Sequence, residues 1–332
     1  MQRTIATILS TAVLALLPLA GVCPEDTSLE YPLYQLTAAP TLDGNIDSDP
    51  AWQGVPEATG FFKLGGDYTR GKQTQVRAAW KGDTVYIAVR CEEPDIRNIT
   101  PQLRDGDDLW TEDGIEIFVR PEGLAGFHQF IVNSGGFRRG EGISKGSLNW
   151  RVAAARGPEL YTLEIALPVS LFGEMPIAGD VWRGNFCRNI FTDISGGDKF
   201  TTWAPLRASF HEWERFARWK FCMESPDPKA TLAVEARLNG VYRQFLRDEI
   251  ERMSRLADTY VPALQRAAKT GPFAEDARRL LEGWAQGTRM KELGPLAPSV
   301  EIRRAVALGE HLVERSHTLK YRFLMGELFN GS

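Results

Sequence analysis

The segment Leu109–Arg120, LWTEDGIEIFVR, limits the possible folds of this chain more than any other. Its odd-numbered residues from Ile115 to Val119 are apolar, so they share one face of a strand while Glu116 lies on the other. The apolar face must meet a core, so we expect Glu116 to point away from it, on the same sheet as Trp110. An indole beside a carboxylate suits a sugar ring, whose C–H groups pack on the indole while its hydroxyls donate to the acid. The alternative is a buried Trp110 and a solvated Glu116.

The chain opens with the pattern of a secretory signal. Arg3 supplies a positive charge, and residues 4–22 form an apolar run that ends at a polar stretch. We therefore expect residues 1–23 to be a signal peptide and the mature protein to be secreted or periplasmic. The residues LAGVC, which end at Cys23, resemble a bacterial lipobox with a valine where a small residue is expected. A membrane partner is expected only if Cys23 is lipidated.

Length and charge narrow the classes of partner. The 332 residues suffice for one large domain and a second unit, and the contents of 43% hydrophobic and 25% charged residues are ordinary for a globular protein. The net charge of −4 gives no reason to expect nucleic acid or an anionic membrane as a partner.

Residues 30–225 predict a mainly β domain, an antiparallel β-sandwich of jelly-roll type, because short β-rich runs alternate with turn signals. The clearest pair is a hairpin of Gln75–Trp80 and Thr84–Cys91 around a Gly-Asp turn. Further strands are expected at 58–64, 113–120, 126–133, 150–155, 161–166, 182–192 and 216–223, with a short helical piece at 50–52.

The pattern changes at residues 225–228, where an Asp-Pro pair can begin a helix. Apolar residues then recur at helical spacing to Leu264, and two more helical stretches are expected at 273–286 and 299–328. We predict that residues 226–332 form an α-helical appendage of about three helices, a region where a protein partner could bind. Residues 230–238 could instead form a last strand. Because the break separates two hydrophobic patterns, we expect removal of residues 226–332 to leave the sandwich folded.

Three cysteines remain after the signal: Cys91, Cys187 and Cys222. Their spacing matches no metal-ligand pattern. All three fall in expected strands, which favours buried free thiols. If an exported chain oxidises one pair, we expect Cys187 with Cys222.

Several motifs occur in an order and spacing that resemble a known family. They are LDGNID at 42–47 with Trp52, VRAAW at 76–80 leading into TVYIAV at 84–89, WTEDGIEIF at 110–118, YTLEIALP at 161–168, NFCR at 185–188 and TWAP at 202–205. Over residues 38–224 the chain resembles the family 9 carbohydrate-binding modules, within the broader group of family-9-like and DOMON-like β-sandwiches.

The resemblance implies an exported, non-catalytic carbohydrate-binding protein that holds a poly- or oligosaccharide between two Trp side chains over polar groups. It places the first stacking Trp at Trp110 and the hydroxyl-binding acid at Glu116. The second Trp is Trp203 or Trp213, and Trp203 is favoured. The polar groups beneath the sugar are expected from Gln129, Asn133, Asn185 and Arg188, although one of the last two must point inward on a regular strand.

The family often carries calcium, and Asp43 and Asp47 could supply hard oxygen ligands. The same residues suit an Asx turn, in which the carboxylate accepts from its own backbone.

Two other functions remain open beside a structural or partner-binding module without sugar affinity. A glycoside-processing enzyme would use two carboxylates facing each other across a bond. Glu112, Asp113 and Glu116 are clustered in one short segment, and Glu164 is a candidate for the facing partner. A haem-binding redox module would need axial ligands, which the body could draw only from His128, His211, Met175 and Met223.

Overall fold

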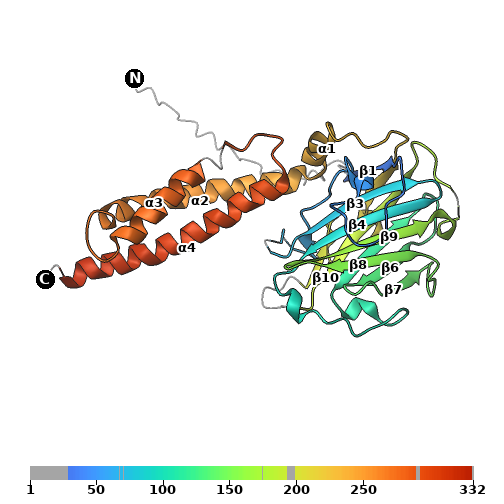
Figure 1. The fold of residues 1–332 in the computed structure, drawn as a ribbon, viewed down its shortest axis with the longest axis horizontal. Helices are drawn as coiled ribbons and strands as arrows, with labels where there is room; N and C mark the ends of the chain where they lie inside the picture. Colours follow the sequence, from blue (N-terminus) through green and yellow to red (C-terminus); the bar gives the residue numbers. More distant parts are fainter. Residues whose placement is uncertain are drawn as a thin grey trace, which may run out of the picture.

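A computed structural model of the chain describes residues 29–330 except 67, 70, 174, 193–198 and 289–291. The expected signal peptide at residues 1–23, with Cys23, lies outside the described residues. The chain forms a β-sandwich, from which a helical arm extends to one side (Figure 1). The expected fold class, mainly β with a C-terminal helical appendage, is therefore confirmed.

The sandwich consists of two sheets joined by one strand, β1 (Glu30–Gln35). We call the two sheets the front and the back sheet. Residues 30–33 of β1 pair in parallel with residues 218–221 of the front sheet, and residues 34–35 pair in parallel with residues 79–80 of the back sheet. Every other pair between the described strands is antiparallel. The front sheet runs β7 (Arg138–Gly142), β6 (His128–Asn133), β5 (Gly114–Arg120), β10 (Val181–Asn189) and β12 (Ala217–Phe221). The back sheet runs β3 (Thr74–Lys81), β4 (Thr84–Glu92), β9 (Leu160–Pro168) and β8 (Arg151–Arg156).

Two short strands extend the front sheet beside the end of β10. β11 (Phe200–Thr202) pairs with β10, and β2 (Phe62–Lys63) pairs with β11. The alternation predicted for β5 is confirmed, because Ile115, Ile117 and Val119 lie in the core between the sheets. The hairpin predicted from Gln75 to Cys91 is also confirmed, and it turns at Gly82, whose φ of +59° suits glycine.

The outer face of the back sheet is covered by the segment 36–57. Trp52, in the short 3₁₀ turn Pro50–Trp52, packs there with Ile46 against Tyr86 and neighbouring side chains. Buried Glu164 ties the segment down, because its carboxylate accepts from the Gly44 amide at 2.8 Å and from Trp52 Nε1 at 2.7 Å. On the outer face of the front sheet, Leu206 and Phe216 cover Phe118 and Cys187, so part of this face remains for a functional site.

The C-terminal region is helical throughout its described length outside short connections. Residues 231–238 are helical, so the alternative of a last strand is wrong. The first helical pattern forms two helices, separated at Asn239. None of the helices in the described residues combines the length and apolar character needed to cross a membrane. The helices are α1 (Thr231–Leu238), α2 (Gly240–Ala267), α3 (Ala274–Thr288) and α4 (Ser299–Asn330).

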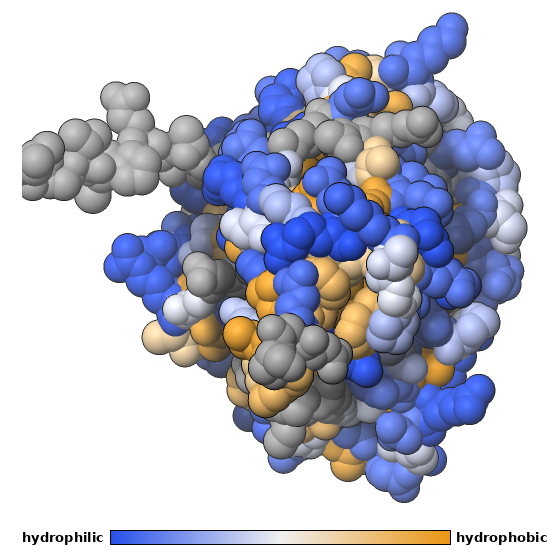
Figure 2. Space-filling model, turned by 90° about the vertical axis from the view of Figure 1, so that its left-hand side faces the viewer, coloured by the Kyte–Doolittle hydropathy of each residue, from blue (hydrophilic) through white to orange (hydrophobic). Residues whose placement is uncertain are grey.

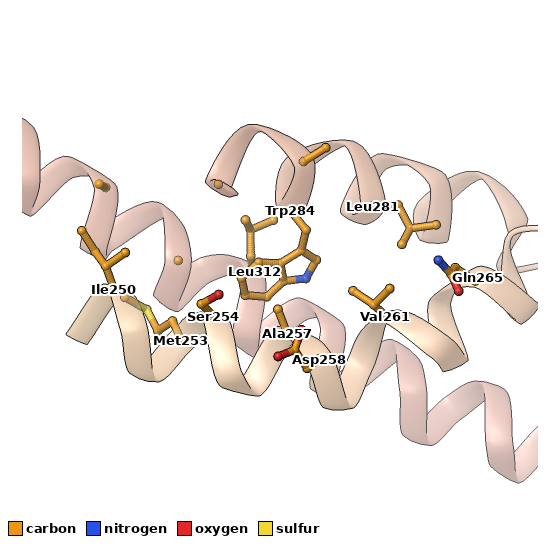
Figure 3. A pocket seen from close by; sticks show the side chains of 14 residues that line it. Ile250, Met253, Ser254, Ala257, Asp258, Val261, Gln265, Leu281, Trp284 and Leu312 are labelled. Atoms are coloured by element: carbon orange, nitrogen blue, oxygen red, sulfur yellow. The ribbon is translucent and has the colours of Figure 1, made fainter. Parts of the chain in front are cut away.

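Helices α2, α3 and α4 pack against one another to form the arm. A cavity of about 330 Å³ lies between them, lined by apolar side chains such as Met253, Leu281 and Leu312 (Figure 3). Viewed from the side on which the arm ends, the surface shows hydrophobic groups surrounded by hydrophilic ones (Figure 2). The last turns of α4 also expose Leu328 and Phe329.

The base of the arm packs on the sandwich. Leu238, the last residue of α1, belongs to the core between the sheets. Tyr242 fits against Gly60, where any Cβ would lie within 2.4 Å of its ring. Arg303 of α4 forms a bidentate ion pair with Glu92 at the end of β4. The packing therefore continues across the change of pattern at residues 225–228.

Candidate functional site

Glu116 occupies the middle of the outer face of the front sheet, opposite Ile131 of β6 and Cys187 of β10. Its side chain is only 4% exposed. Gln129 Nε2 donates to Oε2 at 2.7 Å, and Asn189 Nδ2 donates to Oε1 at 2.7 Å. Burial raises the pKa of Glu116, while these two hydrogen bonds act in the opposite direction. The expectation that Glu116 points away from the core is met, and so is the position of Gln129 beside it.

One hydrogen-bond acceptor of this cluster, the side-chain oxygen of Asn189, lacks a donor among the described residues. Asn189 Oδ1 is buried and has no hydrogen-bond partner among the described residues. An unpaired buried acceptor costs about 1–3 kcal/mol, which a donor from a ligand would recover. Asn189 is not among the site residues predicted from the sequence. Strand alternation could have found it, since 185, 187 and 189 share the face of Glu116.

Aromatic side chains lie on the outer face to either side of Glu116. Trp110 lies in the 3₁₀ turn Leu109–Thr111 and is half-buried. The guanidinium of Arg139, which pairs with Ile131 across β6 and β7, lies 4.7 Å from the centroid of the indole. On the opposite side Phe200 pairs with Asn189 and is 39% exposed. Phe200 was missed because β11 has only three residues, too few for a clear alternation.

The loop that carries Trp110 is held by Glu112 and Asn133. Glu112 Oε1 accepts from the backbone amides of Gln102 and Leu103, and its Oε2 accepts from Asn133 Nδ2 at 2.9 Å. Asn133 Oδ1 accepts from two further amides, and its side chain is fully buried. Asn133 therefore positions Trp110, which differs from the direct ligand contact that we expected.

The clustered carboxylates do not form a facing pair. Asp113 accepts from the Phe191 amide and from Thr192 Oγ1, so it fixes the chain beyond β10. Glu112 accepts a hydrogen bond from the backbone amide of Gln102 in the loop, and Glu164 lies on the back sheet under the segment 36–57. This arrangement lacks the two opposed carboxyl groups that glycoside hydrolysis uses.

Two of the expected ligand-binding residues lie inside the sandwich. Arg188 pairs with Ile115, so it faces the core, where its guanidinium lies 3.4 Å from buried Glu93 and donates to three backbone carbonyls. Trp203 is 2% exposed and packs edge-on against Tyr31 at 5.9 Å between centroids. Neither side chain can contact a ligand on the outer face, so both assignments are corrected.

Asn185 and Trp213 do lie on the outer side, but not beside Trp110. Asn185 is fully buried; its Oδ1 accepts from two amides and its Nδ2 donates to Thr202 Oγ1 at 2.9 Å. Trp213 is half-buried, and its ring lies 4.0 Å from the Arg120 guanidinium. Arg120 is four positions beyond Glu116 on β5, about 13 Å at about 3.3 Å per residue. Trp213 therefore does not form a second wall opposite Trp110.

The residues proposed for calcium do not fit a metal. Asp43 Oδ1 accepts from the Asn45 amide at 2.8 Å in an Asx turn, and Asp47 is paired with Arg90. Across the described part of the chain, no group of three or more His, Cys, Asp or Glu side chains could hold an ion.

The cysteines and histidines of the sandwich are also dispersed. All three described cysteines are free, and Cys222 lies beyond the end of β12 that pairs with Val181, far along β10 from Cys187. His128 faces the core and contacts Ser144 Oγ at 2.7 Å, whereas His211 stacks on Phe127 on the outer side. The two rings cannot ligate one haem.

The fold and this face define a β-sandwich of the ligand-binding kind, with a buried acid flanked by aromatic rings. A family model described as carbohydrate family 9 binding domain-like matches residues 42–204, and the sandwich of this chain belongs to that family. No curated protein shows significant sequence similarity to the chain.

Three solved structures are similar to this chain at low identity. A carbohydrate-binding module family 9 from Caldicellulosiruptor kristjanssonii, in complex with cellotriose, is 15% identical, with 59% of this chain and 95% of that chain covered and a TM-score of 0.46. A carbohydrate-binding module family 9 from the same organism, in complex with glucose, is 16% identical, with 59% of this chain and 98% of that chain covered and a TM-score of 0.46. A putative carbohydrate-binding protein from Bacteroides uniformis ATCC 8492 is 18% identical, with 59% of this chain and 100% of that chain covered and a TM-score of 0.48.

Proposed function

We propose that this protein is an exported, non-catalytic carbohydrate-binding protein, and that its sugar site is the outer face around Glu116. The family of the sandwich supports carbohydrate as the ligand class. The observation that carries the location is the buried Glu116–Asn189–Gln129 cluster between Trp110 and Phe200, with an acceptor oxygen left unpaired.

The chemistry of this cluster suits hydroxyl groups. Each oxygen of Glu116 already accepts one amide N–H and retains capacity for a second donor, and Asn189 Oδ1 needs one. Sugar hydroxyls are such donors, and a charged acceptor strengthens their hydrogen bonds. The apolar C–H face of the same ring would pack on the exposed part of Trp110 or Phe200.

The test is calorimetric titration with the oligosaccharide that binds best to the full chain on a glycan array. Trp110→Ala should weaken binding by about 2–4 kcal/mol, as for the truncation of a central interface residue. Glu116→Gln should weaken it by about 1–3 kcal/mol through loss of the charged acceptor. Two control variants at exposed positions of α4, Tyr321→Ala, which also truncates an aromatic side chain, and Glu301→Gln, which makes the same change as Glu116→Gln, should bind as wild type does.

Thermal melting of the same variants separates binding from folding. A buried structural Trp would cost about 3–5 kcal/mol of stability when cut to Ala. If Trp110→Ala unfolds readily while Glu116→Gln binds as tightly as wild type, this face is not the sugar site.

A further inference from the structure

Three arginines stand side by side across the front sheet, on the same outer face as Glu116. Arg120 of β5 pairs with Arg183 of β10, which pairs with Arg218 of β12. Neighbouring strands lie about 4.8 Å apart, so the three side chains leave the sheet close together. Like charges at directly paired positions destabilise a sheet. Such a row therefore calls for a compensating negative charge.

The described residues supply that charge at one end only. Arg218 Nε lies 3.3 Å from Glu30 Oε2, in an ion pair across β12 and β1. Arg183 donates from Nη1 to the Phe216 carbonyl at 3.1 Å, and no carboxylate of the described chain pairs with it or with Arg120. The nearby carboxylate of Glu212 is taken by Arg215 and by three backbone amides.

The guanidinium of Arg120 is held in place by an aromatic ring, but its Nε lacks a hydrogen-bond acceptor among the described residues. Its carbon lies 4.0 Å from the centroid of the Trp213 ring, which restrains the group by cation–π contact. Its Nε is buried and has no hydrogen-bond partner among the described residues. A restrained guanidinium with free N–H groups favours a planar or tetrahedral oxyanion that accepts two parallel hydrogen bonds.

We propose that Arg120 and Arg183 bind the anionic substituent, carboxylate or sulfate, of an acidic oligosaccharide. This inference rests on the proposed function, because Arg120 lies on the same face of β5 as Glu116, beyond Phe118, which is buried under Leu206 and Phe216. Arg120 lies four residues from Glu116, about 13 Å along the strand, a distance that a single sugar ring does not span. The ligand is therefore an oligosaccharide with a charged unit on the Trp213 side.

The experiment titrates the full chain with three sets of oligosaccharides: neutral, uronic-acid-containing and sulfated. The charged set that fits should bind at least about tenfold more tightly than the neutral set, and added salt should reduce that advantage. The double variant Arg120→Gln, Arg183→Gln should lose the advantage and keep the affinity for neutral sugars. The control variant Arg151→Gln, which removes one arginine charge at an exposed position of β8 on the back sheet, should bind every set as wild type does.

The outcomes separate this inference from the proposed function. Equal affinity for neutral and charged sugars, or charged binding that survives the double variant, overturns the anion site while leaving the sugar site intact. If no set binds the wild type, the proposed function fails and this inference fails with it. The relative affinities of the uronic and sulfated sets identify the anion. Because the double variant removes repulsion between like charges, its melting temperature should not fall, and a large fall would mean that the two arginines are structural.

Discussion

At the scale of the residue, the buried carboxylate of Glu116 lowers the stability of the fold at neutral pH, and the same carboxylate is the proposed acceptor for sugar hydroxyls. Burial raises its pKa in the folded protein, so its contribution to stability is present at low pH and is lost as pH rises through that raised value. Ionised Glu116 is therefore a cost at neutral pH. Gln can replace it with little rearrangement, because Asn189 can turn its amide and present the oxygen that now lacks a partner.

We therefore expect Glu116→Gln to raise the melting temperature at neutral pH, although it weakens sugar binding. The gain should shrink as pH is lowered and the wild-type carboxyl becomes protonated. Thermal melts of both proteins over a series of pH values measure the difference. A variant that melts below wild type at neutral pH would show that the carboxylate is stabilised by its two amide partners beyond its cost of burial.

Strand alternation predicted some site residues and not others. Along β5 it placed Glu116 on the outer face, and along β10 it showed that Asn185 and Arg188 could not both face the ligand. It could not place Trp203, because β11 ends at residue 202 and no periodic pattern continues beyond it. It also could not show that Asn133 and Glu112 bond each other, since that contact depends on the path of a loop.

At the scale of the element, the junction between α1 and α2 fixes the base of the arm. Asn239, only 4% exposed, separates the two helices and bonds the sandwich with both ends of its amide. Its Oδ1 accepts from the Thr59 amide at 2.9 Å, and its Nδ2 donates to the Glu57 carbonyl at 2.8 Å. The Thr59 N–H and the Glu57 C=O of the sandwich thus take their hydrogen-bond partner from a side chain of the helical region.

Asn239→Ala should lower the free energy of unfolding by about 2–4 kcal/mol, because it leaves a buried N–H and a part-buried C=O without their partner. Gln244→Ala, at an exposed position of α2, should change stability by no more than about 0.5 kcal/mol. Denaturant unfolding of both variants measures these effects, and hydrogen exchange should report faster opening at the Thr59 amide. Equal stability of the two variants would mean that water replaces the Asn239 bonds at no cost.

Long periodic elements could be predicted, and short or unusual ones could not. The sequence predicted β3, β4, β5 and β9, as well as the helices α3 and α4. It did not predict β1, whose six residues include Pro32 and which pairs in parallel with both neighbours. It did not predict β7, RRGEG, because this edge strand has no apolar residue. Charged edge strands resist aggregation, but they carry no hydrophobic pattern.

At the scale of the whole molecule, the division predicted at residues 225–228 follows composition, whereas the packing crosses it. Leu238 completes the core of the sandwich, and Tyr242 fills the space over Gly60. At the same base of the arm, Arg303 of α4 forms an ion pair with Glu92 of the sandwich. Burial raises the pKa of Glu92, but Arg303 outweighs it and holds that pKa below its usual value. The stabilisation from this pair is therefore present at neutral pH and is lost as pH falls through the lowered value.

Two truncations distinguish the compositional boundary from the packing boundary. A chain that ends at residue 226 loses Leu238 and both Asn239 bonds, so we expect its unfolding free energy to fall by at least about 3 kcal/mol. A chain that ends at residue 247 keeps α1, Asn239 and Tyr242, and its sandwich should melt cooperatively near the temperature of the full protein. Calorimetric melting of both chains, with sugar titration as a second measure, tests this. If the two melt alike, α1 adds nothing to the sandwich, and the domain boundary lies where the composition changes.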